Sequence, residues 1–298
     1  MNIRLGRGRE RRPAGLFLLP AVVIILLTTL YPLAYSLFLS GQSWNMAIPN
    51  SQPVANFPDN YTALLTDQTF LSSVRTTFVF VGVSVVLELA IGMALALLIT
   101  STLRFLGFVR TMLLIPVMIA PVVVGVLWRT LYHTDYGPVN DLLATLGLPG
   151  REWLGDASNA LSSVILVEVW QQTPVVTLIL AAGIASIPVE LGEAAKVDGA
   201  SGPRTFWSVT LPLLRRVILV VLVLRIMDLF KTFDLIFTLT QGGPGGATDV
   251  LSNLIYRTGL RAFQIGTSAA MSWVFLVIVV LVSLVFVRQV MRREDSSS

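Results

Sequence analysis

Apolar residues are concentrated in six runs along the chain, each close to 20 residues or slightly longer. A helix of roughly 20 residues is what the hydrocarbon core of a bilayer requires. The first run follows several arginines, as a signal peptide would, but it is too long and lacks a small-residue cleavage site. The pattern therefore predicts an all-α membrane protein with six transmembrane helices, at residues 16–39, 74–100, 109–132, 160–183, 217–239 and 269–290.

The segment between the fourth and fifth runs, residues 186–215, is polar enough to leave the bilayer and yet has a helical pattern. Pro188 can begin a first short helix, Gly199 and Pro203 can separate it from a second, and Pro212 can lead the chain into the fifth run. An ordinary interhelical loop and a rigid element held by another protein both fit this pattern.

Polar residues interrupt the fourth and fifth runs near their centres. The fifth run carries four charges at a three-residue spacing: Arg225, Asp228, Lys231 and Asp234. A charge at a helix centre costs roughly 2.5–3.5 kcal/mol to insert, so these side chains need partners, and the spacing predicts the pairs Arg225–Asp228 and Lys231–Asp234. The fourth run supplies Glu168, Gln171 and Gln172, and we expect Pro174 to interrupt its helix.

Three explanations compete for these polar centres. They can form a buried network that fixes helix packing, or a proton relay, or the lining of a solute pathway. Arginine does not release its proton at physiological pH, which disfavours a relay through Arg225. Carboxylate, guanidinium and amide groups beside aromatic rings suit a sugar, whose hydroxyls need hydrogen bonds and whose C–H faces pack on rings. We therefore favour the pathway.

Three other segments between the apolar runs are short and rich in turn residues. Residues 41–69 are too few for a separate domain of ordinary size. Residues 136–156 predict a short helix and a turn, and the glycine-rich residues 240–246 predict a turn after the fifth run.

Basic residues predict the orientation. If the amino terminus is cytoplasmic, fourteen of the twenty-one lysines and arginines lie on the cytoplasmic side. Both termini and residues 186–215 are then cytoplasmic. The predicted organisation is a basic segment at 1–15, a membrane domain at 16–290 and a tail at 291–298. The cytoplasmic basic residues are Arg4, Arg7, Arg9, Arg11, Arg12, Arg104, Arg110, Lys196, Arg204, Arg215, Arg216, Arg288, Arg292 and Arg293.

Composition agrees with a membrane protein and excludes several chemistries. Hydrophobic residues make up 54% of the chain and charged residues 13%, with a mean hydropathy of +0.77. The chain lacks cysteine, and the single histidine, His133, cannot form a zinc site unaided. No nucleic-acid partner is expected, because the net charge of +4 comes from arginines at helix ends. A nucleotide-binding Gly-x4-Gly-Lys-Ser/Thr loop is missing, so this chain is not expected to hydrolyse ATP, and energy must come from elsewhere.

A spaced motif within residues 186–215 carries a family resemblance. Glu193-Ala194-Ala195 is followed by three residues, Gly199, nine residues, Val209, one residue and Leu211-Pro212. The chain resembles the permease subunits of bacterial ABC-type carbohydrate importers, notably the larger subunit of maltose-type importers and related disaccharide and glycerol-phosphate permeases. The resemblance implies the type I ABC importer permease fold, in which a cytoplasmic coupling helix contacts an ATPase subunit.

The resemblance also implies functional residues. Those expected to couple to an ATPase are Glu193, Ala194, Ala195, Asp198, Gly199, Leu211 and Pro212. Those expected to line the substrate path are Glu168, Gln171, Gln172, Val175, Arg225, Leu229 and Thr232, to which the charge spacing adds Asp228. No cofactor is expected in this chain, because ATP and Mg²⁺ would bind the ATPase subunits. Expected partners are a second permease subunit, two ATP-binding cassette subunits, an extracytoplasmic solute-binding protein, the carbohydrate and membrane lipid.

The predicted function is therefore a non-catalytic permease subunit in a bacterial inner membrane, importing a di- or oligosaccharide by alternating access. The alternatives are an ABC permease for another polar solute, such as a glycerol-phosphodiester, and an ion-coupled secondary transporter. One departure from maltose-type subunits is the short 41–69 region, where those proteins carry a large external domain. The resemblance therefore gives this region no docking role.

Overall fold

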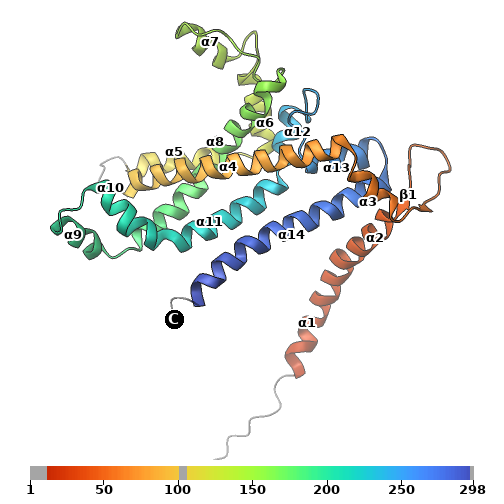
Figure 1. The fold of residues 1–298 in the computed structure, drawn as a ribbon, viewed down its shortest axis with the longest axis horizontal. Coiled ribbons are helices and arrows are strands. Elements are labelled where there is room, and N and C mark those ends of the chain that lie inside the picture. Colours follow the sequence, from red (N-terminus) through yellow and green to blue (C-terminus); the bar gives the residue numbers. More distant parts are fainter. Residues whose placement is uncertain (1–11, 101–105, 296–298) are drawn as a thin grey trace, which may run out of the picture. The chain divides into compact units, whose positions relative to one another are not determined.

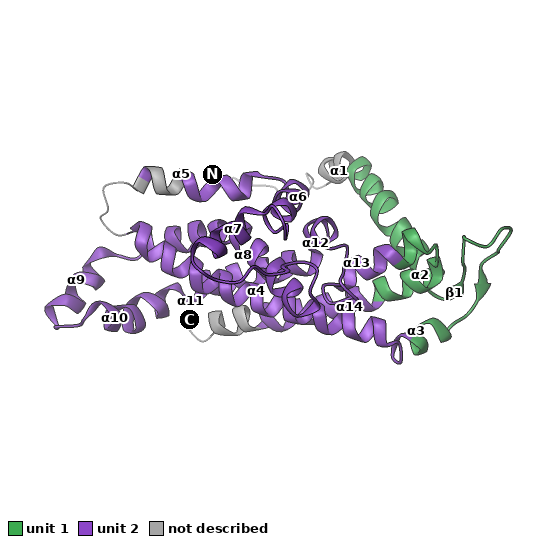
Figure 2. Ribbon diagram, turned by 90° about the horizontal axis from the view of Figure 1, so that it is seen from above, with its two compact units in different colours: residues 1–63, 258–273 green, residues 64–257, 274–298 purple. Residues whose placement is uncertain are grey.

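The computed structural model describes residues 12–100 and 106–295, and its regular structure is mainly helical (Figure 1). Two compact units divide the chain (Figure 2). The smaller comprises residues 1–63 and 258–273, and the larger comprises residues 64–257 and 274–298.

The smaller unit begins with one continuous helical segment. It consists of α1 (Arg12–Ile25), the π-helix η1 (Leu26–Leu30) and α2 (Tyr31–Ser40). Residues Leu19–Ser40 are long and apolar enough to cross a membrane, as predicted for the first run.

A short hairpin follows this helix. β1 (Gln42–Ser43) pairs antiparallel with β2 (Val54–Ala55), and α3 (Asp59–Leu64) comes next. The Asn60 side chain donates a 2.8 Å hydrogen bond to the Ser40 carbonyl oxygen, which ties α3 to the end of α2. The region 41–69 is therefore a small elaboration of the first helix, in agreement with its predicted size.

The larger unit is built on two long helices, α4 (Gln68–Thr100) and α8 (Ala157–Ala185), which correspond to the second and fourth predicted spans. They pack closely because Gly92 has no side chain: a Cβ there would lie 2.7 Å from Cγ1 of Val176. Phe80, Val164 and Ile236 are among the fully buried side chains of the core.

Helix α8 runs through Pro174 without a break, so the predicted interruption is wrong. Proline removes a single N–H from the helical ladder, and packing against neighbouring helices can hold the segment in place. Pro174 is buried among such neighbours.

The third predicted span is not one straight helix. It consists of α5 (Leu106–Met118) and α6 (Pro121–Leu131), which are bent by 100° where they meet. Ala120 has an extended backbone (ψ 140°), the conformation that a following proline favours. Pro121 therefore accounts for the break. A hydropathy scan does not detect it, because a proline barely changes the mean hydropathy of the run.

The fifth predicted span, 217–239, is also divided. α11 (Leu211–Lys231) ends at Thr232, whose ψ of 117° is not helical, and α12 (Asp234–Leu239) follows. Within the described residues, four helices are long and apolar enough to cross a membrane, and the bent α5–α6 pair makes five. α11 carries five charged residues in its 21 and is not among them.

The remaining helices include the short helix predicted within residues 136–156 and the helix predicted for the last apolar run. α7 (Pro138–Thr145) is the expected short helix. α13 (Leu251–Tyr256) and the π-helix η3 (Arg257–Arg261) precede α14 (Ile265–Asp295), which contains the sixth predicted span.

Residues 186–215 form two helices, as predicted, but the second is not short. α9 (Val189–Val197) begins directly after Pro188. α10 (Gly202–Thr205) continues through the π-helix η2 (Phe206–Thr210) into α11, so the backbone is helical from Gly202 to Lys231.

Some residues behind the orientation prediction lie outside the described part of the chain. They are Arg4, Arg7, Arg9, Arg11 and Arg104, and the predicted terminal segments 1–15 and 291–298 are described only in part.

Candidate functional site

A buried charge cluster joins three helices of the larger unit. Arg225 of α11 donates through Nε to Glu88 Oε2 (2.7 Å) and through Nη2 to Glu88 Oε1 (3.0 Å). The same Nη2 donates to Glu168 Oε1 (2.9 Å). Glu88 belongs to α4 and Glu168 to α8. The three side chains are between 0% and 6% exposed.

This geometry explains how three charges are accommodated inside an apolar bundle. The planar guanidinium meets Glu88 with two parallel hydrogen bonds, the strongest arrangement for this pair. Removing one partner from a buried ion pair is costly, because the remaining charge is then desolvated without compensation. The cluster therefore holds α4, α8 and α11 together.

Asp228 and Lys231 form an accessible extension of the cluster. Lys231 Nζ lies 3.0 Å from Asp228 Oδ1, and Arg225 Nη1 lies 3.8 Å from Asp228 Oδ2. The Asp228 and Lys231 side chains are 57% and 71% exposed. The predicted Arg225–Asp228 contact is present but long. The predicted Lys231–Asp234 pair is wrong, because α11 ends before Asp234 and Lys231 pairs with Asp228 one turn earlier.

Gln171 has a defined structural partner. Its Nε2 donates a 2.9 Å hydrogen bond to the carbonyl oxygen of Ile119, at the break between α5 and α6. The side chain is 2% exposed. A helix break leaves backbone groups without their usual partners, and a buried carbonyl needs a donor. Gln171 supplies one.

We expect Gln171→Leu to destabilise the protein by about 1–3 kcal/mol, because the partly buried Ile119 carbonyl loses its donor. Thermal unfolding of the purified protein in detergent measures the effect. Gln172→Leu is the matched control, since the neighbouring side chain is partly exposed. Equal melting temperatures for the two variants would contradict a structural role for Gln171.

The predicted path residues divide into two groups by burial. Glu168, Gln171, Arg225 and Leu229 are buried. Gln172, Val175, Asp228 and Thr232 are partly or well exposed. In this conformation only the second group is accessible from outside the packed helices.

Glu88 is a member of the cluster that the sequence reasoning missed. It is the only acidic residue in the apolar run 74–100, and that isolation was a usable signal.

Residues 186–215 of the larger unit contain helix α9, which ends in a tight turn. Asp198 N–H donates to the Ala194 carbonyl (2.9 Å), and Ala200 N–H donates to the Ala195 carbonyl (2.9 Å) across Gly199. Gly199 has φ +75°, the left-handed conformation that glycine adopts at a helix C-terminus. The sequence around the motif therefore dictates this turn.

The loop presents an open surface. α9 has no buried residues, and Glu193, Ala194, Asp198 and Gly199 are exposed. Of the remaining motif residues, Ala195 and Leu211 are partly exposed and Pro212 is exposed. Three large apolar side chains are also accessible: Val189 (71%), Val197 (88%) and Trp207 (68%). Exposed apolar groups beside charges are typical of a protein contact surface.

The chain thus combines apolar helices long enough to cross a membrane, a buried charge cluster and an exposed helical loop. A family model described as "binding-protein-dependent transport system inner membrane component" matches residues 88–293. The chain belongs to this family.

Two relatives and one solved structure show the extent of the similarity. The probable ABC transporter permease protein y4oQ of Sinorhizobium fredii is 40% identical over 267 residues, covering 90% of this chain and 86% of the relative. The trehalose/maltose transport system permease protein MalF of Thermococcus litoralis is 34% identical over 287 residues, covering 96% of each. A chain of a bacterial ABC transporter involved in import of the acidic polysaccharide alginate matches with a TM-score of 0.80 at 25% identity, covering 94% of this chain and 95% of that chain.

Proposed function

We propose that this chain is a permease subunit of an ATP-driven, binding-protein-dependent importer of a di- or oligosaccharide. The observation that carries the proposal is the match to a trehalose/maltose permease along 96% of both chains. The accessible carboxylate, ammonium and amide groups on α8 and α11 are suited to hydroxylated solutes.

The proposed topology has six spans with both termini in the cytoplasm. The four long apolar helices supply four spans, the bent α5–α6 pair a fifth and α11 with α12 the sixth. The charges of α11 are compatible with a span because Arg225 is paired internally, while Arg215 and Arg216 lie near its first turn. The clustering of arginines at residues 4–12 supports the orientation.

In the proposed complex this chain carries out no catalysis. Two ATP-binding cassette subunits bind ATP and Mg²⁺, and a second permease subunit completes the solute path. A binding protein delivers the solute from outside, in keeping with the description of the family. Closure of the ATPase pair moves residues 186–215 and exchanges inward-facing and outward-facing states, which is alternating access.

The proposed roles follow burial. Gln172, Val175, Asp228 and Thr232 contact the solute, and the buried Glu168, Gln171, Arg225 and Leu229 keep α8 and α11 in position for them. Glu193 and Asp198 offer carboxylates to basic groups on the ATPase, while Ala194, Ala195 and Gly199 let it approach closely. Leu211 and Pro212 join this surface to α11.

A panel of solutes tests the proposal. We expect ATP hydrolysis by the reconstituted complex, with its binding protein, to rise severalfold with trehalose, maltose or a longer saccharide. Methionine and a glycerol-phosphodiester are added in parallel measurements as representatives of other solute classes. Stimulation by the phosphodiester alone would replace the carbohydrate assignment, and uptake that collapses with an ionophore but persists without ATP would replace the ATP-driven mechanism.

A further inference from the structure

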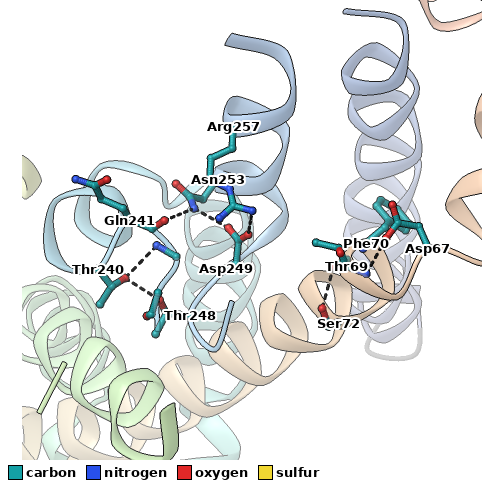
Figure 3. A network of polar contacts seen from close by, with 12 residues as sticks. Asp67, Thr69, Phe70, Ser72, Thr240, Gln241, Thr248, Asp249, Asn253 and Arg257 are labelled. Carbon is teal, nitrogen blue, oxygen red and sulfur yellow. Dashed lines mark hydrogen bonds and ion pairs between the residues drawn. The ribbon is translucent and has the colours of Figure 1, made fainter. Parts of the chain in front are cut away.

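A polar cleft is lined by residues other than those of the buried charge cluster. It has a volume of about 710 Å³ and is bounded by the first turns of α4 and by the loop between α12 and α13, both in the larger unit. Figure 3 shows the side chains of both segments. The residues predicted to line the solute path or to contact an ATPase are not among those described as lining this cleft, whereas the predicted glycine-rich turn at 240–246 forms one of its walls.

The floor of the cleft is a fixed polar network. Asp249 is 2% exposed and lies 3.1 Å through Oδ2 from Arg257 Nη2. Asn253 Nδ2 donates to Asp249 Oδ1 (2.6 Å) and to the Gln241 carbonyl (3.2 Å), as Figure 3 shows. Gly242 makes this possible, because a Cβ there would lie 2.6 Å from Asn253 Nδ2.

The network is largely satisfied within the protein. Asp249 Oδ1 accepts from Asn253, and Asp249 Oδ2 has Arg257 Nη2 at ion-pair distance. Burial raises the pKa of Asp249, and the Asn253 amide and the Arg257 guanidinium oppose that rise. Among the described residues Asn253 Oδ1 has no hydrogen-bond partner, but Asn253 does not line the cleft. The network therefore fixes the shape of the floor, and the walls supply the hydrogen-bonding groups for a ligand.

The walls present neutral donors and acceptors. Gln68, Thr69 and Ser72 on α4 are exposed, and the opposite wall includes Gly245 and Gly246, which add no side chains. A ligand can therefore approach both side-chain hydroxyls and the backbone.

The charges of the cleft disfavour an anionic ligand. Asp249 and Arg257, the charged residues that line it, compensate each other. The first amides of α4 are not available either, because Asp67 Oδ1 already accepts from the N–H groups of Thr69 (2.7 Å) and Phe70 (3.2 Å). The anion site that a helix N-terminus often provides is thus occupied by the protein itself.

We infer that this cleft is a second binding site, for a neutral polyhydroxylated solute, that holds the sugar before it enters the path beside α8 and α11. The inference rests on the proposed function, whose topology places the α12–α13 loop outside the membrane. Binding is weak, because none of the described residues that line the cleft has an aromatic ring to stack on a sugar face. A staging site needs such weak binding, since the solute must leave it again.

The cysteine-free sequence permits a direct test. Ser72→Cys places a thiol in the cleft, and Ser162→Cys is its matched control. Both serines are exposed in the first two turns of a long helix, and each donates to the carbonyl three residues earlier (2.9 Å to Thr69, 2.7 Å to Asn159). The rate of modification by a membrane-impermeant maleimide is measured on the assembled complex without its binding protein.

We expect trehalose or maltose, at about twice its dissociation constant, to slow modification at position 72 about threefold and to leave position 162 unchanged. Methionine should protect neither position. Equal rates with and without sugar at position 72, in a complex whose ATP hydrolysis responds to sugar through the binding protein, would overturn the second site and leave the proposed function intact. Protection by sugar-free binding protein but not by sugar would also overturn it, by making the cleft a protein contact.

Discussion

Gly199→Asp is expected to reduce solute-driven transport at least about tenfold, equivalent to roughly 1.4 kcal/mol or more of lost coupling, while the protein still inserts in the membrane. Apart from its two chain neighbours, no atom of the described residues lies within 4 Å of a Cβ placed at Gly199. The new side chain therefore points into open space, and an effect larger than that of backbone strain indicates a partner that packs on the turn. Uptake and solute-stimulated ATP hydrolysis measure the loss.

Backbone strain must be separated from loss of the partner contact, because Gly199 has a positive φ. Gly147→Asp is the matched control: Gly147 has φ +72°, compared with +75° for Gly199, and its Cβ would also meet nothing within 4 Å. Both variants carry the same strain, on the order of 1–2 kcal/mol. Equal transport by the two variants would remove the docking role of residues 186–215.

Arg225→Met is expected to lower the free energy of unfolding by about 3–5 kcal/mol and to deplete the folded protein from the membrane. The substitution leaves the buried carboxylates of Glu88 and Glu168 without their shared partner. Folded protein is measured by size-exclusion chromatography after detergent extraction. Adding Glu88→Gln and Glu168→Gln should restore part of the yield, because neutral amides are much less costly to bury.

Asp228→Asn separates packing from solute contact. Its side chain is 57% exposed, so we expect normal amounts of protein and altered solute-stimulated turnover. If Arg225→Met accumulates as well as Asp228→Asn does and loses only turnover, the buried cluster has a direct role with the solute and little role in folding.

Hydropathy located the long, predominantly apolar helices and was less successful for the third and fifth runs, which the structure divides into two helices each. The long helices α4 and α8 were placed within a few residues. The α5–α6 break depends on the backbone of one alanine before Pro121, which does not change the hydropathy of the run. Pro174 had the opposite outcome, because tertiary packing keeps α8 helical through it.

The charged centres were found, but their pairing was not predictable from local spacing. Arg225 was matched to Asp228 on its own helix, whereas its short contacts come from Glu88, 137 residues away, and from Glu168, 57 residues away. Spacing along one helix says nothing about which neighbouring helix is packed against it. The cleft at Asp249 was missed for the same reason, since its walls come from α4 and from a loop far along the chain.

Helix α11 has a mechanical consequence. Figure 1 shows that the chain turns where α10 and η2 lead into α11, at a π-helix followed by Pro212, both of which bend helices. α11 itself has 21 residues, about 31 Å at 1.5 Å per residue, with Leu211 at one end and Arg225 near the other. A displacement at Leu211 that moves α11 as a unit therefore reaches Arg225, and the guanidinium must either drag Glu88 and Glu168 with it or give up its hydrogen bonds to them.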